Sequence, residues 1–179
     1  MVTHSMGNHF SMRTLTLTND KSDALKWIEN IIFAAPDVPV AQLRDALSAA
    51  DLEGTCPNYT LYYSTNDYAL VASFLGRIFS PDLRKRAGRD GIMLKMEDQL
   101  RLQTLDASDT NSISHLTLSS EGHSYYLDET PVIKDMVDVV NSTPKDLLAV
   151  RKKRNNIDNH PKHEEGMYKW KFNVQKESN

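Results

Sequence analysis

The stretch Thr3-His4-Ser5-Met6-Gly7 decides how the rest of this sequence is interpreted. It fits the pattern Gly-x-Ser-x-Gly, with Thr3 in place of the first glycine. That pattern is typical of a sharp turn between a strand and a helix, which exposes a nucleophilic serine and favours small residues two positions away on either side. A serine beside a glycine is more often a simple helix cap, so the interpretation depends on residues further along the chain.

Downstream of this turn, short apolar runs alternate with segments of helical periodicity. The run Ile28–Ala35 is almost continuously apolar and closes at Pro36-Asp37, as expected for a buried parallel strand. Apolar residues spaced three and four apart predict the helices. We predict strands over 28–35, 59–64 and 100–105, the last near a sheet edge, and helices over 8–18, 40–50, 68–79 and 132–140. This alternation predicts an α/β fold with a parallel sheet flanked by helices.

The composition is that of an ordinary globular domain. At 179 residues and 40% hydrophobic, the chain is long enough for one domain with its own core. A net charge of -3 gives no argument for nucleic-acid binding. The single cysteine, Cys56, cannot form an internal disulfide, and no run approaches the roughly 18 apolar residues of a membrane span. We therefore predict a cytoplasmic protein without a membrane span or a cofactor.

The C-terminal part differs from the rest in charge, and we divide the chain into a body, 1–145, and a basic tail, 146–179. Residues 151–179 contain eight basic and four acidic residues, a net charge of +4, against 13 basic and 20 acidic residues, or -7, in the remainder. The run Arg151-Lys152-Lys153-Arg154 is interpreted as a solvated end of a helix rather than a nucleic-acid site. Aromatic residues alternate with lysines over 167–174, which predicts a strand that docks on the body or on a partner.

A serine hydroxyl is a weak nucleophile near neutral pH and needs a histidine and a carboxylate to activate it. The chain offers Ser5, then Asp67 just after a predicted strand, then His123 in a loop after the next strand. Residues at the carboxyl ends of parallel strands converge at one edge of the sheet. Asp67 could instead cap the helix that begins directly after it, and Asp37, after the preceding strand, is the alternative acid.

Several short motifs occur in an order that resembles one bacterial family of α/β-hydrolases, long labelled domain of unknown function 900. These motifs are His4-Ser5-Met6-Gly7-Asn8, Ala35-Pro36-Asp37-Val38, Leu61 to Leu70 (Leu-Tyr-Tyr-Ser-Thr-Asn-Asp-Tyr-Ala-Leu), Arg86-Ala87-Gly88 and Gly122-His123-Ser124-Tyr125-Tyr126. The resemblance covers about residues 1 to 140. It implies a partial α/β-hydrolase fold over 1–145, and it does not identify a substrate.

The resemblance also implies a role for each candidate residue. Ser5 would be the nucleophile, His123 the general base and then acid, and Asp67 the carboxylate that orients His123. The backbone N–H of Met6 would be one donor of the oxyanion hole. The other histidines lack a Cys/His/Asp arrangement with metal-ligand spacing, so we predict no metal.

Only Met1 to His4 precede the serine, whereas this fold usually places several strands before it. We therefore expect a truncated chain that lacks the second oxyanion donor, and removing one such donor costs about 10²- to 10³-fold in rate. We also expect an exposed apolar edge strand that favours self-association.

The sequence supports two hypotheses for the function. The first is a serine hydrolase of the esterase or lipase kind, acting on a small-molecule carboxylic ester or related acyl bond, with impaired activity; a peptidase stays open. The second is a non-catalytic hydrolase remnant or binding module.

Overall fold

The computed structural model describes residues 1–17, 27–51, 58–75, 85–92, 94–95, 102–110, 120–141, 150–151, 157–159, 167–168 and 170–172. Cys56, Lys152 to Arg154 and parts of four predicted elements, at 18, 76–79, 100–101 and 169 with 173–174, lie outside these ranges.

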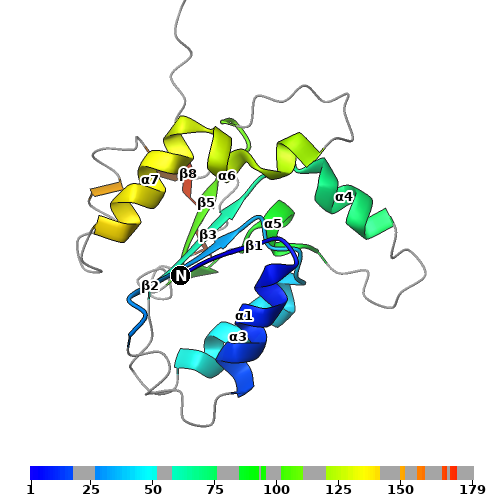
Figure 1. Cartoon of the computed structure of the whole chain (residues 1–179), viewed down its shortest axis with the longest axis vertical. Helices are drawn as coiled ribbons and strands as arrows, with labels where there is room; N and C mark the ends of the chain where they lie inside the picture. The colour runs from blue at the N-terminus through cyan, green and yellow to red at the C-terminus, as the bar shows by residue number, and fades with distance from the viewer. Residues whose placement is uncertain are drawn as a thin grey trace, which may run out of the picture.

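Six strands form the main sheet, in the order β1-β2-β3-β5-β8-β6 (Figure 1). Their bounds are β1 Val2–His4, β2 Asn30–Ala34, β3 Asn58–Tyr63, β5 Leu102–Asp106, β8 Trp170–Phe172 and β6 Ile157–Asn159. The first five in the spatial order are parallel, and β6 is antiparallel to β8. A separate two-stranded sheet pairs β4, Leu94–Lys95, with β7, Met167–Tyr168. The largely parallel sheet confirms the fold class expected from the sequence.

Helices cover both faces of this sheet (Figure 1). On one face lie α1, Gly7–Leu17, and α3, Val40–Asp51; on the other lie α6, Tyr125–Asp128, and α7, Thr130–Asn141. The shorter helices are α4 Tyr68–Leu75, α5 Ala87–Asp90 and the 3-10 helix η2 Ser120–His123. Within the described ranges, no helix is long and apolar enough to cross a membrane.

Strand β2 lies between two apolar cores and contributes to both. Successive side chains of a strand point to opposite faces, so Ile31 and Phe33 pack in one core while Ile32 and Ala34 pack in the other. The first core also contains Met12, Leu15, Leu43 and Ala46, and the second contains Tyr125, Val132 and Val139. Because both faces are covered, the strand is apolar at successive positions, which explains the continuous run in the sequence.

The predicted helices and strands of the body are present within the described ranges, with small shifts at their ends, whereas the strand predicted over 167–174 is found as two short strands, β7 and β8, in different sheets. A prediction about β5 was wrong. Its alternating leucines favoured a strand near a sheet edge. In the structure β5 lies between β3 and β8, and all five of its residues are buried. The additional neighbour, β8, comes from residues far along the chain, and the local leucine pattern contains no information about it.

The outermost strand of this sheet is β1, whose residues were not predicted to form a strand. The side chains of Met1 and Val2 are about half exposed, at 48% and 49%. Self-association through this edge stays a prediction.

The C-terminal segment contributes to the same sheet through β8 and β6, and one of its arginines is completely buried. The Arg151 guanidinium donates to both carboxylate oxygens of Asp135 on α7, at 2.9 and 2.8 Å. It also donates to Thr60 on β3, at 3.0 Å, and to Gln103 on β5. The hydroxyl of Tyr62 donates to Asp135 at 2.5 Å. The interpretation of Arg151 as part of a solvated charge run was therefore wrong, because the carboxylate that pairs with it lies inside the fold.

Gly88 allows α5 to lie directly against the loop after β2. A Cβ at Gly88 would be 2.4 Å from the carbonyl carbon of Ala35 and 2.6 Å from the nitrogen of Pro36, and neither backbone atom can move cheaply. At Gly7, by contrast, a Cβ would meet no heavy atom within 4 Å. The Gly-x-Ser-x-Gly pattern favours a small residue at position 7, but in this turn no neighbouring atom requires one.

We predict that Arg151→Met destabilises the fold by about 3–5 kcal/mol, because Asp135 would remain buried without its partner. Urea unfolding followed by circular dichroism measures this loss. Lys134→Met serves as the matched control, since Lys134 is exposed on the same helix as Asp135. Equal unfolding midpoints for Arg151→Met and the wild-type protein would contradict the assigned ion pair.

We predict that Gly88→Ala lowers the free energy of unfolding by about 1–3 kcal/mol, the usual range for overpacking. Gly7→Ala should leave it unchanged or raise it by about 0.5–1 kcal/mol, because alanine is the better helix former and has open space there. Thermal unfolding of the two variants provides the comparison. The packing argument fails if both variants unfold at the same temperature.

Candidate active site

Ser5 occupies the turn between β1 and α1, where the backbone is held in an uncommon conformation. Its φ is 50°, in the left-handed region that residues other than glycine rarely adopt. Such a conformation costs of order 1–3 kcal/mol and persists only when surrounding contacts enforce it. The serine directly follows the end of β1 and precedes an 11-residue helix.

Hydrogen bonds on both sides of the peptide unit hold this turn. The N–H of Ser5 donates to the carbonyl oxygen of Ala34, at 3.1 Å. Its carbonyl oxygen accepts from the N–H of Asp37 and the N–H of Asn8, both at 3.2 Å, and from the side-chain amide of Asn8, at 2.9 Å. Thr3 completes the arrangement, because its hydroxyl donates to the Asn8 side-chain oxygen at 2.7 Å. Thr3, where the pattern has glycine, therefore takes part in fixing the turn.

Asp67 and His123 are brought into contact, although they lie 56 residues apart in the sequence. Nδ1 of His123 is 2.7 Å from Oδ2 of Asp67. Asp67 is completely buried, and the His123 side chain is 13% exposed. The neighbouring Tyr125 is also buried. Its pKa is raised well above the usual value, first by burial and then by the charge of Asp67. Within this dry surrounding, a carboxylate beside His123 is strongly favoured to accept its Nδ1 proton.

The two interpretations of Asp67 that the sequence left open, a helix cap and a partner of His123, are compatible in this geometry. Oδ1 accepts from the backbone N–H of Leu70 at 3.2 Å, which caps the first turn of α4. Oδ2 binds His123. Each oxygen has a separate task, so the helix cap also fixes the direction of the carboxylate.

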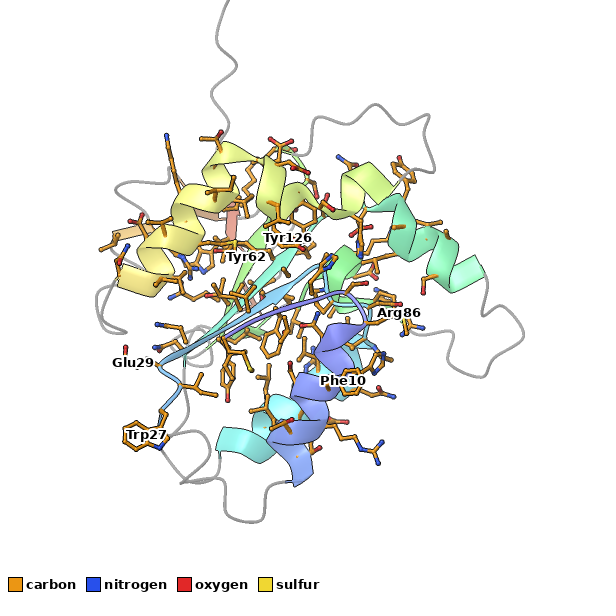
Figure 2. The ribbon with its side chains drawn as sticks, in the orientation of Figure 1. Phe10, Trp27, Glu29, Tyr62, Arg86 and Tyr126 are labelled. Atoms are coloured by element: carbon orange, nitrogen blue, oxygen red, sulfur yellow. The ribbon has the colours of Figure 1, made fainter. Side chains whose placement is uncertain are left out.

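Asp37, the alternative acid, is held by different side chains. Its Oδ2 accepts from the hydroxyl of Ser73 at 2.8 Å, and its Oδ1 lies 3.4 Å from Nε of Arg86. Both members of this ion pair are nearly fully buried. The position of Arg86 beside α5 can be followed in Figure 2. The Asp37 side chain thus secures the loop whose N–H supports Ser5, and it is Asp67 that contacts His123.

His4 contributes more to the site than its sequence position suggested. Its ring lies 4.6 Å from the ring of His123 and 4.7 Å from the ring of Tyr126, measured between centroids. Burial, and after it the charge of His123, lowers the pKa of His4. The sequence indicated only that His4 packs against neighbouring loops. Strand alternation could have placed it opposite Thr3, but the identity of its neighbours depends on the fold.

The oxyanion donor proposed from the sequence, the N–H of Met6, directly follows Ser5 and precedes α1. Met6 and Phe10, one turn further along, are both exposed apolar side chains. Phe10 is labelled on α1 in Figure 2. Among the described residues, no group of three or more His, Cys, Asp or Glu side chains could hold a metal ion.

In comparisons with known proteins, residues 1–138 match one family model. They match the family described as alpha/beta hydrolase of unknown function (DUF900). No curated protein and no solved structure matches the chain. The family match includes the Ser5 turn, both candidate acids and His123. Since it spans more than half of the sequence, the chain belongs to this family of α/β hydrolases.

Proposed function

We propose that this protein is a serine hydrolase that cleaves a carboxylic ester or a related acyl bond of a small molecule. Ser5 is the nucleophile, His123 the general base and acid, and Asp67 the carboxylate that orients His123. The observation that carries the proposal is the 2.7 Å contact between His123 Nδ1 and the buried Asp67, next to a strained serine turn. Strain at a serine in a strand-to-helix turn is typical of a nucleophile position.

The contact with Asp67 determines which nitrogen of His123 is available. With its proton on Nδ1 shared with Asp67, the ring keeps an unprotonated Nε2 that can accept the proton of the Ser5 hydroxyl. The serine oxygen then bonds to the acyl carbon, and His123 donates the same proton to the departing alcohol. Water repeats the sequence on the acyl-enzyme, giving the free acid and restoring Ser5.

Negative charge on the acyl oxygen needs donors that are already in place. The N–H of Met6 is suited to this because it lies at the N-terminus of α1, where the helix dipole favours an anion. Sites of this kind use two donors, and one donor is worth about 10²- to 10³-fold in rate.

We predict that a fluorophosphonate probe labels the wild-type chain and that Ser5→Ala abolishes the labelling, because Ser5 is the hydroxyl that His123 activates in this mechanism. Ser11→Ala is the matched control, since Ser11 lies on the helix directly after the turn and should leave labelling unchanged. In-gel fluorescence and mass spectrometry measure the modification. A folded wild-type protein that stays unlabelled would favour the non-catalytic alternative.

Asparagine at position 67 separates the two tasks of the carboxylate. We predict that Asp67→Asn keeps the α4 cap, because asparagine caps helices well, but slows Ser5 labelling by on the order of 10⁴-fold, as expected when the histidine tautomer is wrong. The labelling rate and the unfolding temperature measure these effects separately.

Asp37→Asn is the comparison for this prediction. It weakens the pairing with Arg86 and should reduce stability. The labelling rate per folded molecule should stay within about an order of magnitude of the wild-type rate, because the Asp37 side chain is held by Arg86 and Ser73, whereas Asp67 contacts His123. The opposite ranking, with Asp37→Asn unreactive and Asp67→Asn reactive, would assign the acid to Asp37.

A further inference from the structure

His4 ends β1 and lies between the nucleophile turn and the histidine of the candidate site. Thr3 directs its hydroxyl to Asn8 of α1, so strand alternation directs His4 to the opposite face of the sheet, where α6 lies. There its ring contacts His123 at an interplanar angle of 46° and Tyr126 at 37°. Tyr126 is visible on this side of the sheet in Figure 2. The three rings form a contiguous group, with His4 in contact with both others.

We propose that His4 is a positioning residue, whose ring holds the plane of the His123 imidazole so that Nδ1 meets Asp67 and Nε2 is presented to Ser5. This inference rests on the proposed catalytic role of His123. It extends that proposal to a residue for which the sequence gave no catalytic task.

The need for such a contact arises from the geometry of the His123–Asp67 pair. One hydrogen bond at Nδ1 sets a distance, but it leaves the ring able to turn about the line that joins the two residues. Packing against a ring face removes that freedom. His4 is well suited because it is next to Ser5 in the chain, so the same strand end places the nucleophile and the surface against which the base packs.

Charge also favours His4 in this position. Its pKa is lowered by burial and then by the charge of His123, while the backbone of His123 and the charge of Asp67 act in the opposite direction. A neutral His4 permits His123 to carry the transferred proton without a like charge at ring-contact distance. Nε2 of His4 is buried and has no hydrogen-bond partner in the part of the chain that the structure describes. A hydrogen bond with the backbone of His123 adds to the ring contact, so a ring without nitrogens tests whether the flat ring by itself holds the plane of the His123 imidazole.

The experiment compares His4→Phe, which keeps a flat ring, with His4→Leu, which fills much of the volume without one. His9→Leu is the matched control, since His9 lies on α1, outside the ring group. All variants are made in the full 179-residue chain, and circular dichroism verifies that each is folded. Should His4→Leu fail to fold, His4→Ile replaces it, because a β-branched residue suits the end of a strand.

Two measurements are made on each variant. Proton NMR detects the downfield resonance of the His123 Nδ1 proton, assigned by its loss in His123→Gln. Labelling with a fluorophosphonate probe gives a rate per folded molecule. We expect His4→Phe to keep the resonance and to react within about twofold of the wild-type rate. His4→Leu should broaden the resonance through solvent exchange and react about 10-fold more slowly or worse, since a misplacement of about 1 Å can cost about 100-fold.

The His123 Nδ1 proton resonance tests the positioning role of His4 even if the protein has no activity. An unlabelled wild-type chain would overturn the proposed function, and loss of the resonance in His4→Leu alone would still support the positioning role. A sharp resonance in His4→Leu, or none in the wild-type protein, would overturn it. Equal loss in His4→Phe and His4→Leu would overturn it as well, because the flat ring would then not be the feature that matters.

Discussion

Parallel pairing of the strands is the constraint on which the candidate site depends. The register aligns His4 with Ala34, Ala34 with Tyr62, and Tyr63 with Asp106, so β1, β2, β3 and β5 end at nearly the same level. Residues that come directly after these strands meet at one edge of the sheet, whatever their separation in sequence. Ser5 follows β1, and Asp67 follows β3 after a short turn. Both residues therefore lie at the same edge of the sheet, as a consequence of backbone pairing.

At this edge of the sheet, several residues adopt backbone conformations or positions that are unfavourable on their own. Ser5 and Ala35, at the ends of neighbouring strands, both have positive φ values, 50° and 43°. The Ala35 N–H donates to the carbonyl oxygen of Tyr62, which ties the second strained residue to the next strand. Buried charges add a further cost, which is offset only where each is paired. Asp37 and Asp67 are each paired by residues from other parts of the chain, so the strained turns and the buried acids stabilise one another.

How much of this was predictable differs between the fold and the site. The strand Asn30–Ala34 and the helix Val40–Asp51 were predictable because their apolar patterns are local and strong. The central position of β5 was not, because its neighbour β8 comes from a distant part of the chain. Arg151 was misjudged for a related reason. A run of basic residues is usually solvated, and only the fold reveals that Asp135 on α7 and Thr60 on β3 surround its first member.

In the site, the sequence identified Ser5, Asp67 and His123 through motif order, but it could not distinguish among the contacts that hold them. The cap at Leu70 and the bond to His123 use different oxygens of one carboxylate, so two interpretations that seemed exclusive are compatible. His123 is the residue with the weakest local support, since it ends a short 3-10 helix rather than a strand. Its position must come from packing, and the rings of His4 and Tyr126 lie where that packing is required. The strand that leads to the candidate nucleophile therefore also carries a ring that contacts the candidate base.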